Sequence, residues 1–273
     1  MPSDKTALGD RMKGYEQVTR AVLPRRSYTI IRVDGKSFHS YLKHATRPFD
    51  FDFMAAMDEV ARALCTEIAG SVFAYTQSDE VSVLVTDFKS IQTQPWLGGY
   101  VQKLASISAS IATAAFNRTA AEYRATRLLK VNGVATFDGR VFTVPEQVEA
   151  ANYFLWRQRD ALRNSILMAA QAQFSARRLH GVNTDQMQEM LWQEKSINWG
   201  DYPDGCKRGR VCVRKVSGQV GTFVDERSQQ EVTMPFFRTR WETRGAPSFT
   251  ATPDGFLAGI IPPLPSLESG RSA

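Results

Sequence analysis

The stretch "YTIIRVDGKSFHSY", residues 28 to 41, joins an apolar run to a polar turn. Its first six residues include two adjacent isoleucines, which is typical of a short strand. The run ends at Asp34 and Gly35. An Asp-Gly pair fits a hairpin turn, because both residues tolerate positive φ. A carboxylate beside a glycine carbonyl at a strand end also fits a hard-cation site, and this stretch alone leaves both interpretations open.

Composition favours a globular protein with a polyanionic partner. The chain has 273 residues, of which 43% are hydrophobic and 23% charged, with a net charge of +6 and a pI near 9.3. A basic excess of this size favours nucleic acid as the partner. The three cysteines, Cys65, Cys206 and Cys212, lack CxxC spacing, which argues against a zinc site and a disulfide framework and indicates reduced thiols in the cytoplasm. With no signal-peptide pattern and no run of about 18 apolar residues, we expect a soluble protein without a membrane partner.

The order of predicted elements points to an α/β (α+β) fold. A strand at 28–33 is followed by a helical stripe at 50–69, strand-like runs at 71–75 and 81–85 around a polar turn, a helix beginning near 96 and a strand near 133–145. This is the order of a ferredoxin-like sheet with two helices on one face. Helices near 146–178 and 184–193 and a basic, β-prone segment at 207–244 come after it. We therefore expect a palm-like catalytic domain at 1–145, a helical and basic RNA-contacting part at 146–245 that completes the same globule, and a loosely ordered Pro/Gly-rich tail at 246–273.

That layout supplies a second carboxylate for the Asp34 site. Asp79 lies at the tip of the predicted hairpin, in "AYTQSDEVSV". In a ferredoxin-like sheet this tip neighbours the end of the first strand, so Asp34 and Asp79 could share ions. Palm-type polymerases and nucleotidyl cyclases hold two magnesium ions with two such carboxylates. For Asp79 taken alone, a plain polar hairpin tip is the simpler interpretation.

Five motifs together carry a resemblance to a known family. "RVDGKSFHSY", "AYTQSDEVSV", "FDGRVFTVP", "FLWRQRDALRNS" and "QEKSINW" with "YPDGCKRG" resemble the tRNA-histidine guanylyltransferase family over roughly residues 15 to 216. Members of this family extend RNA at its 5′ end, in the 3′–5′ direction. The resemblance implies that Asp34, the Gly35 carbonyl and Asp79 bind two Mg²⁺ ions, with the two aspartates catalytic. It also implies a nucleotide-binding set whose members contact the triphosphate or guanine, in part through the backbone amides of the Lys36–His39 turn: Lys36, Ser37, Phe38, His39, Arg47, Asp50, Ser78, Lys103 and Arg140.

The chain departs from the family's eukaryotic members at one informative place. Those members carry His-x-Asn-Asn where this chain reads Leu162, Arg163, Asn164 and Ser165. The substitution resembles the "like" branch of bacteria, archaea and phages, which prefers template-dependent repair of 5′-truncated tRNA. We expect RNA contacts from one predicted helix face and from basic residues further on: Arg157, Asp160, Asn164, Lys195, Lys207, Arg208 and Arg210.

The expected function is nucleotide addition in the 3′–5′ direction to the 5′ end of tRNA, by template-dependent repair and by guanylate addition to tRNA-histidine. The expected partners are tRNA, GTP and other nucleoside triphosphates, ATP for 5′ activation, and further copies of this chain in a dimer or tetramer. A nucleotidyl cyclase would use the same aspartate pair but has little use for the basic segments. A non-catalytic RNA-binding protein would keep the basic segments but has no need of the two aspartates.

Overall fold

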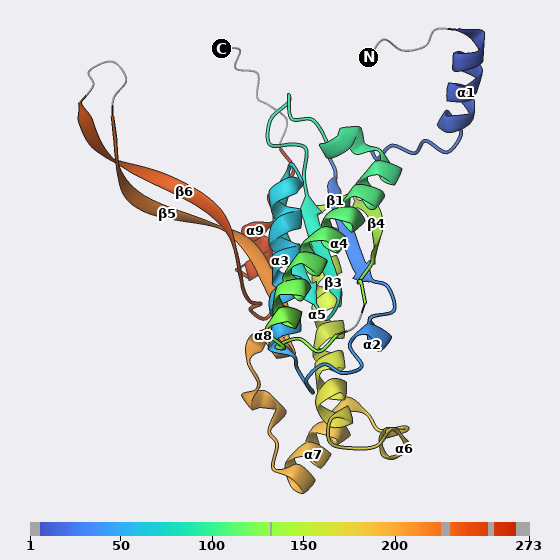
Figure 1. The fold of residues 1–273 in the computed structure, drawn as a ribbon, viewed down its shortest axis with the longest axis vertical. Helices are drawn as coiled ribbons and strands as arrows, with labels where there is room; N and C mark the ends of the chain where they lie inside the picture. Colours follow the sequence, from blue (N-terminus) through green and yellow to red (C-terminus); the bar gives the residue numbers. More distant parts are fainter. Residues whose placement is uncertain (1–5, 132, 225–229, 251–253, 266–273) are drawn as a thin grey trace.

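One six-stranded antiparallel sheet organises the molecule (Figure 1). The computed structural model describes residues 6–131, 133–224, 230–250 and 254–265. The strand order is β4-β1-β3-β2-β5-β6. The strands are β1 (Tyr28–Gly35), β2 (Ser71–Gln77), β3 (Glu80–Val85), β4 (Phe137–Val144), β5 (Arg210–Val224) and β6 (Glu231–Gly245). The first four strands have the ferredoxin-like order, so the predicted fold class is confirmed.

Two helices cover one face of the sheet, as expected. Helix α3 (Phe51–Glu67) and helix α4 (Val101–Ala125) bury apolar side chains against β1, β2 and β3 in one hydrophobic cluster. Gly139 permits the close approach of β4 to α4, because a Cβ there would lie 2.3 Å from the Ala105 carbonyl oxygen. The residues that are apolar at helical spacing in the sequence therefore form the first half of the core.

The opposite face is covered by helix α5 (Gln147–Gln171) and by the segment after β6. Phe249, Leu257 and Ile261 are buried there with Tyr28 and Phe73 of the sheet. The expectation of a loose tail from residue 246 is wrong for the described part of that segment. Its Pro and Gly residues suggested an irregular backbone, but the apolar side chains between them pack on the sheet. The segment includes the short helix α9 (Phe256–Ile260).

Helix α5 continues past the sheet and forms a third, smaller cluster. It ends at Gln171, earlier than expected, and a turn leads to α6 (Ala176–Leu179) and α7 (Thr184–Lys195). Phe174 in this turn is buried against Ile166 and Leu191. No Gly or Pro marks the end of α5, so the sequence holds no strong stop signal there.

Strands β5 and β6 form a long arm that leaves the body (Figure 1). Only Arg210, Val211 and Cys212 pair with β2, and the rest of the arm is two-stranded. Helix α1 (Ala7–Gln17) also projects and buries no residue. The remaining short elements are α2 (Phe38–Tyr41), η1 (Trp96–Gly99), η2 (Trp199–Asp201) and α8 (Asp204–Lys207). None of the described helices has the length and apolarity needed to cross a bilayer.

Candidate active site

The end of β1 and the β2–β3 turn meet as the topology predicts. Gly35 N donates a 3.1 Å hydrogen bond to the Asp79 carbonyl oxygen, and Asp34 lies directly opposite Glu80 in the β1–β3 ladder. Gly35 is required by packing, because a Cβ would lie 2.3 Å from the Phe38 ring. The structure therefore brings Asp34 and Asp79 to one end of the sheet.

The electrostatics of this pair suit a bound cation. Burial raises the pKa of the Asp79 carboxyl above its ordinary value, and the negative charges of Asp34 and Glu80 raise it further. The hydrogen bond from Ser78 lowers this pKa but does not outweigh the burial. Ser78 Oγ donates that bond at 2.9 Å to Asp79 Oδ1. Among the described residues, no group of three or more His, Cys, Asp and Glu side chains could hold a metal. Two carboxylates and a carbonyl fit magnesium, which takes few protein ligands and completes its shell with water and substrate phosphates.

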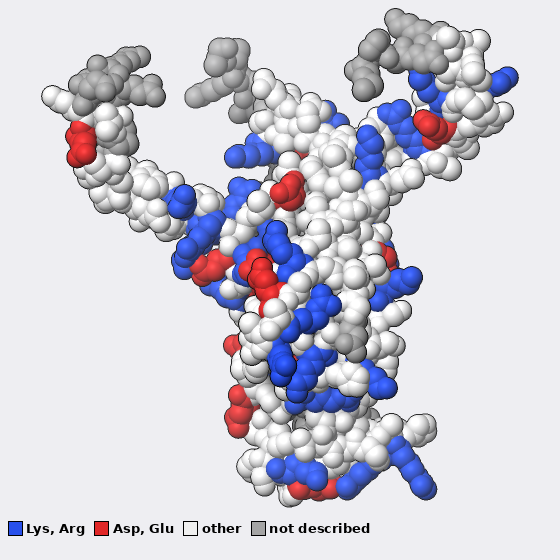
Figure 2. Space-filling model, in the orientation of Figure 1, with Lys and Arg blue, Asp and Glu red and all other residues white. Residues whose placement is uncertain are grey.

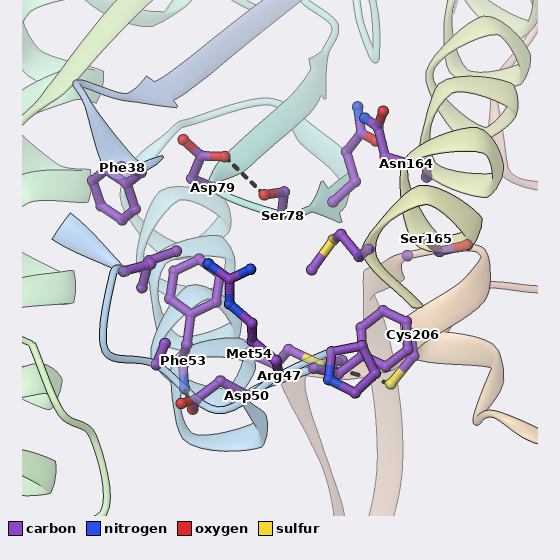
Figure 3. A pocket seen from close by; sticks show the side chains of 18 of the residues that line it. Phe38, Arg47, Asp50, Phe53, Met54, Ser78, Asp79, Asn164, Ser165 and Cys206 are labelled. Carbon is purple, nitrogen blue, oxygen red and sulfur yellow. Dashed lines mark hydrogen bonds between the residues drawn. The ribbon is translucent and has the colours of Figure 1, made fainter. Parts of the chain in front are cut away.

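A cavity of about 460 Å³ opens beside Asp79, which lines it, while Asp34 is not among its lining residues. Its size is in the range of small-molecule sites in proteins. Figure 3 shows Ser78 and Asp79 on one side of the cavity, Arg47 and Asp50 on the opposite side, and Asn164 of α5 on a third. The lining also includes Phe38 and His39 from the expected nucleotide-binding set. The site thus combines carboxylates, one exposed arginine and an apolar wall in a space that can hold a nucleotide.

Three residues of the expected nucleotide-binding set have structural roles. The Asp50 carboxylate is buried and accepts bonds from Phe53 N at 2.9 Å and Thr46 N at 2.8 Å, so it caps α3 and fixes the preceding loop. The Lys36 amide donates to Thr136 O at 2.8 Å and is therefore not directed at a phosphate. Phe38 is 3% exposed and packs in the core cluster, so it contributes an apolar wall.

The other three residues of this set lie outside the cavity wall. Ser37 is exposed in the turn, with a φ of 58°. Arg140 lies on β4 opposite Arg32 and forms a 3.5 Å ion pair with Asp138. Two strand positions from Asp34, it is close enough to reach a triphosphate held there.

Lys103 lies at the other end of the sheet. It is exposed in the first turn of α4, 5.5 Å above the Tyr100 ring. The next residue, Leu104, lines a small pocket with Thr29 of β1. Thr29 is five residues before Asp34, which is about 16 Å along a strand. Within one copy of the chain, the structure does not bring Lys103 to the cavity.

The expected RNA contacts divide into buried and exposed groups. Arg157 is 7% exposed, Lys207 9% and Arg210 7%, and these three side chains bind Glu80, the Gly200 carbonyl and Asp58 respectively. Their burial corrects the expectation that they contact RNA. Arg208 is partly buried and pairs with Asp204 at 2.5 Å. The sequence pattern did not show these partners, because each lies far along the chain or in a turn.

The remaining expected contacts stay accessible. Asn164 lines the cavity, and Lys195 is exposed in the last turn of α7. Burial raises the pKa of Asp160, but the bond from Arg163 and the charge of Arg157 outweigh it and hold the pKa below its usual value. Figure 2 shows Lys and Arg side chains gathered from the base of the arm towards the lower part of the molecule, with fewer acidic ones between them. This face suits a polyanion.

Sequence reasoning missed some of the cavity lining. Gln77 is the last residue of β2, while Gly205, Cys206 and Gly209 approach from the segment around α8. The motif "YPDGCKRG" in that segment was the available signal, since two glycines in a short run mark close backbone approach.

Comparisons with known proteins agree with this geometry. A family model described as tRNAHis guanylyltransferase matches residues 9–145. A probable tRNA(His) guanylyltransferase of Drosophila melanogaster is 28% identical over 237 residues, covering 81% of this chain and 76% of the relative. The tRNA(His) guanylyltransferase of Saccharomyces cerevisiae is 25% identical over 210 residues, covering 72% of this chain and 86% of the relative.

Solved structures extend the match beyond residues 9–145. A bacterial tRNA(His) guanylyltransferase-like protein in complex with ATP superposes with a TM-score of 0.79 at 38% identity, covering 93% of this chain and 99% of that chain. The same kind of protein in complex with GTP gives a TM-score of 0.72 at 38% identity, covering 89% and 94%. The similarity therefore includes the segments that close the cavity.

Proposed function

Because this chain belongs to the tRNAHis guanylyltransferase family, whose activity is 3′–5′ nucleotide addition to tRNA, we propose that it repairs 5′-truncated tRNA in a template-dependent reaction that requires magnesium. The observation that carries the proposal is the Asp34–Asp79 pair beside a nucleotide-sized cavity. The ATP and GTP complexes of the bacterial relatives support purine nucleotides as ligands.

The residues of the chain have distinct roles in this reaction. Bound magnesium would promote deprotonation of the incoming nucleotide's 3′-hydroxyl and neutralise charge on the triphosphate. Asp34, Asp79 and the Gly35 carbonyl would hold the ions. Arg47 and Arg140 would bind phosphate oxygens, and the side chains of the Lys36–His39 turn would contact the nucleotide. The attacked group is the activated 5′ phosphate of the RNA. Where the end is a monophosphate, ATP would adenylylate it with release of pyrophosphate, and the attack would then release AMP; from a triphosphate end the attack would release pyrophosphate.

Template dependence rests on the segment around Leu162. Leu162 has no hydrogen-bonding group in its side chain, and Arg163 is held by Asp160 at 2.8 Å. Base-specific reading by these two residues is therefore weak. Selection would come from Watson–Crick pairing of the incoming nucleotide with the opposite strand of the acceptor stem.

The test supplies tRNAs that lack the 5′ nucleotide, with the templating base varied through all four identities. We expect the complementary nucleotide to be restored whatever the anticodon, and faster than intact tRNA-histidine gains an untemplated guanosine. Addition of guanosine alone, and only to a tRNA with the histidine anticodon, would contradict the repair proposal. Omitting RNA tests the cyclase alternative, because a cyclase converts the nucleotide without it.

We further propose a cytoplasmic enzyme that acts as a dimer or tetramer. The three cysteines are unpaired and buried, which suits a reducing compartment. Val220 and Phe237 on the arm are 72% and 80% exposed, which supports contact with another copy. Sedimentation analysis of the protein and of a Phe237→Ser variant tests the assembly.

A further inference from the structure

A third carboxylate lies at the same end of the sheet as Asp34 and Asp79. Glu80 follows Asp79 directly and is the ladder partner of Asp34. It is 6% exposed, whereas Asp34 and Asp79 are partly exposed, and its carboxylate contacts Arg157 of α5. The two carboxylates of the proposed metal site therefore have a third acid beside them that is directed elsewhere.

Arg157 of α5 holds this acid through two parallel hydrogen bonds. Arg157 Nε donates to Glu80 Oε1 at 2.8 Å, and Nη2 donates to Oε2 at 2.7 Å. Ser82 Oγ donates to Oε1 at 3.3 Å, and Arg32 Nη1 lies 3.8 Å from Oε2. Both carboxylate oxygens thus accept hydrogen bonds from the planar guanidinium group, whose geometry fixes the direction of the carboxylate.

The fork is itself held in place. The Arg157 guanidinium lies 4.5 Å from the centroid of the Trp156 ring, and Nη2 also contacts Asp160 at 3.2 Å. Arg157 is 7% exposed, so this contact is sheltered from water. These contacts hold the guanidinium in the orientation that keeps Glu80 directed towards α5.

The direction of Glu80 matters for the choice of metal. Magnesium suits a site with few carboxylates that relies on substrate phosphates, whereas a higher count of charged ligands raises affinity for calcium-like ions. A glutamate side chain is long enough to turn towards a neighbouring ladder position once its partner is removed. We propose that Arg157 is a positioning residue that holds Glu80 away from Asp34 and Asp79 and so limits the metal site to two carboxylates. The inference rests on the proposed magnesium site.

The experiment measures Mn²⁺ binding by the loss of the electron paramagnetic resonance signal of free Mn²⁺, with a non-hydrolysable GTP analogue and no RNA, relative to the same analogue without protein. The variants are Arg157→Gln, the double variant R157Q/E80Q and, as a matched control, Arg159→Gln on the exposed side of the same helix. Arg157→Gln should bind Mn²⁺ more tightly, by a factor on the order of ten, because a third carboxylate joins the site. The double variant and Arg159→Gln should bind it as the wild type does.

Two outcomes overturn the inference. The first is unchanged or weaker Mn²⁺ binding by folded Arg157→Gln, and the second is equally tight binding by the double variant. If Arg157→Gln does not fold, Arg157→Lys replaces it, since lysine keeps the charge but loses the fork, and binding about threefold tighter is then expected. Unchanged binding by Arg157→Lys also overturns the inference.

A separate variant tests the metal site on which this inference rests. Asp34→Asn should abolish Mn²⁺ binding. If the wild type binds no Mn²⁺ with the analogue, the proposed magnesium site fails. If the wild type binds Mn²⁺ and Asp34→Asn does not, but the Arg157 variants bind it as the wild type does, the positioning role fails and the metal site stands.

Discussion

The Asp34–Asp79 pair should reduce the stability of the metal-free protein, and Asp79→Asn should relieve this. Asp34 is the neighbour of Gly35, whose N donates the 3.1 Å bond to the Asp79 carbonyl oxygen, so the two aspartates are one ladder position apart. Side chains at such offset positions of two paired strands are on the order of 6 Å apart. Two unit charges at that separation repel by about 3 kcal/mol at an effective dielectric constant of 20 and by about 0.7 kcal/mol in water. Both carboxylates are partly exposed, so we expect Asp79→Asn to raise the free energy of unfolding by about 1–2 kcal/mol.

The sign of this stability change and its dependence on pH follow from the pKa of Asp79. Burial and the neighbouring charges raise this pKa above its ordinary value of 3.8 in the folded protein. The unfolded chain therefore releases the proton more readily, and the wild type loses stability as pH rises from that value through the raised pKa. At a pH below the ordinary value the carboxyl is protonated in both states, and the advantage of Asp79→Asn disappears. The amide oxygen of the substituted side chain can still accept the bond from Ser78.

The assay is thermal unfolding in EDTA at neutral pH and at low pH. For a chain of this size the expected gain corresponds to roughly 2–4 °C in Tm. With a non-hydrolysable GTP analogue, magnesium at about a hundred times its Kd should then stabilise the wild type by about 2.7 kcal/mol and Asp79→Asn by much less. Asp201→Asn, an exposed carboxylate elsewhere, serves as the control. A less stable Asp79→Asn in EDTA, or one with the full response to magnesium, would refute the reasoning.

Three further predictions follow from contacts described above. Asp50→Ala should lower the free energy of unfolding by about 1–2 kcal/mol in urea titrations, because α3 loses its N-cap, and an unchanged midpoint would contradict this role. Gly139→Ala should lower it by about 1–3 kcal/mol, since the new methyl group meets the Ala105 carbonyl oxygen, whereas Gly14→Ala, with open space around it in α1, should not. Lys207→Met should lower the free energy of unfolding and leave the salt dependence of tRNA binding unchanged, because this lysine is buried. Lys195→Met should reduce that salt dependence without loss of stability, because this lysine is exposed. If Lys207→Met instead reduced the salt dependence and left stability unchanged, Lys207 would belong to the RNA-binding surface.

The catalytic half of the fold was predictable because its signals are local. The apolar run before Asp34 and the two runs around Asp79 each mark a strand by composition and by the turn that ends it. Once the ferredoxin-like order is assumed, the topology alone makes Asp34 and Asp79 neighbours. Their separation of 45 positions along the chain is then no obstacle.

The site beyond this pair was harder to predict because it depends on tertiary packing. Arg157 has the sequence signature of an exposed, charged helix face, and nothing near it shows that Glu80 is its partner. The buried contacts of Phe249 and Leu257 were hidden for the same reason in a segment whose composition suggested disorder. Lys103 is a different case. Because β3 is antiparallel to β1, the helix after β3 must start at the end of the sheet where β1 begins. The topology therefore predicts that Lys103 lies far from Asp34, although its position in the family motif suggested that it contacts the nucleotide.

The strap of residues after β6 has a consequence for synthesis of the protein. It supplies Ala246, Phe249, Leu257 and Ile261 to the second face of the sheet, and Tyr28 Oη near the start of the chain donates a 2.7 Å bond to the Pro262 carbonyl oxygen. A chain emerging from the ribosome therefore forms the α3–α4 face first and leaves the outer part of the other face bare until residues 246–262 have emerged. Nascent chains that stall before residue 246 should be the forms that bind chaperones and aggregate, because α5 alone leaves part of that apolar sheet surface uncovered.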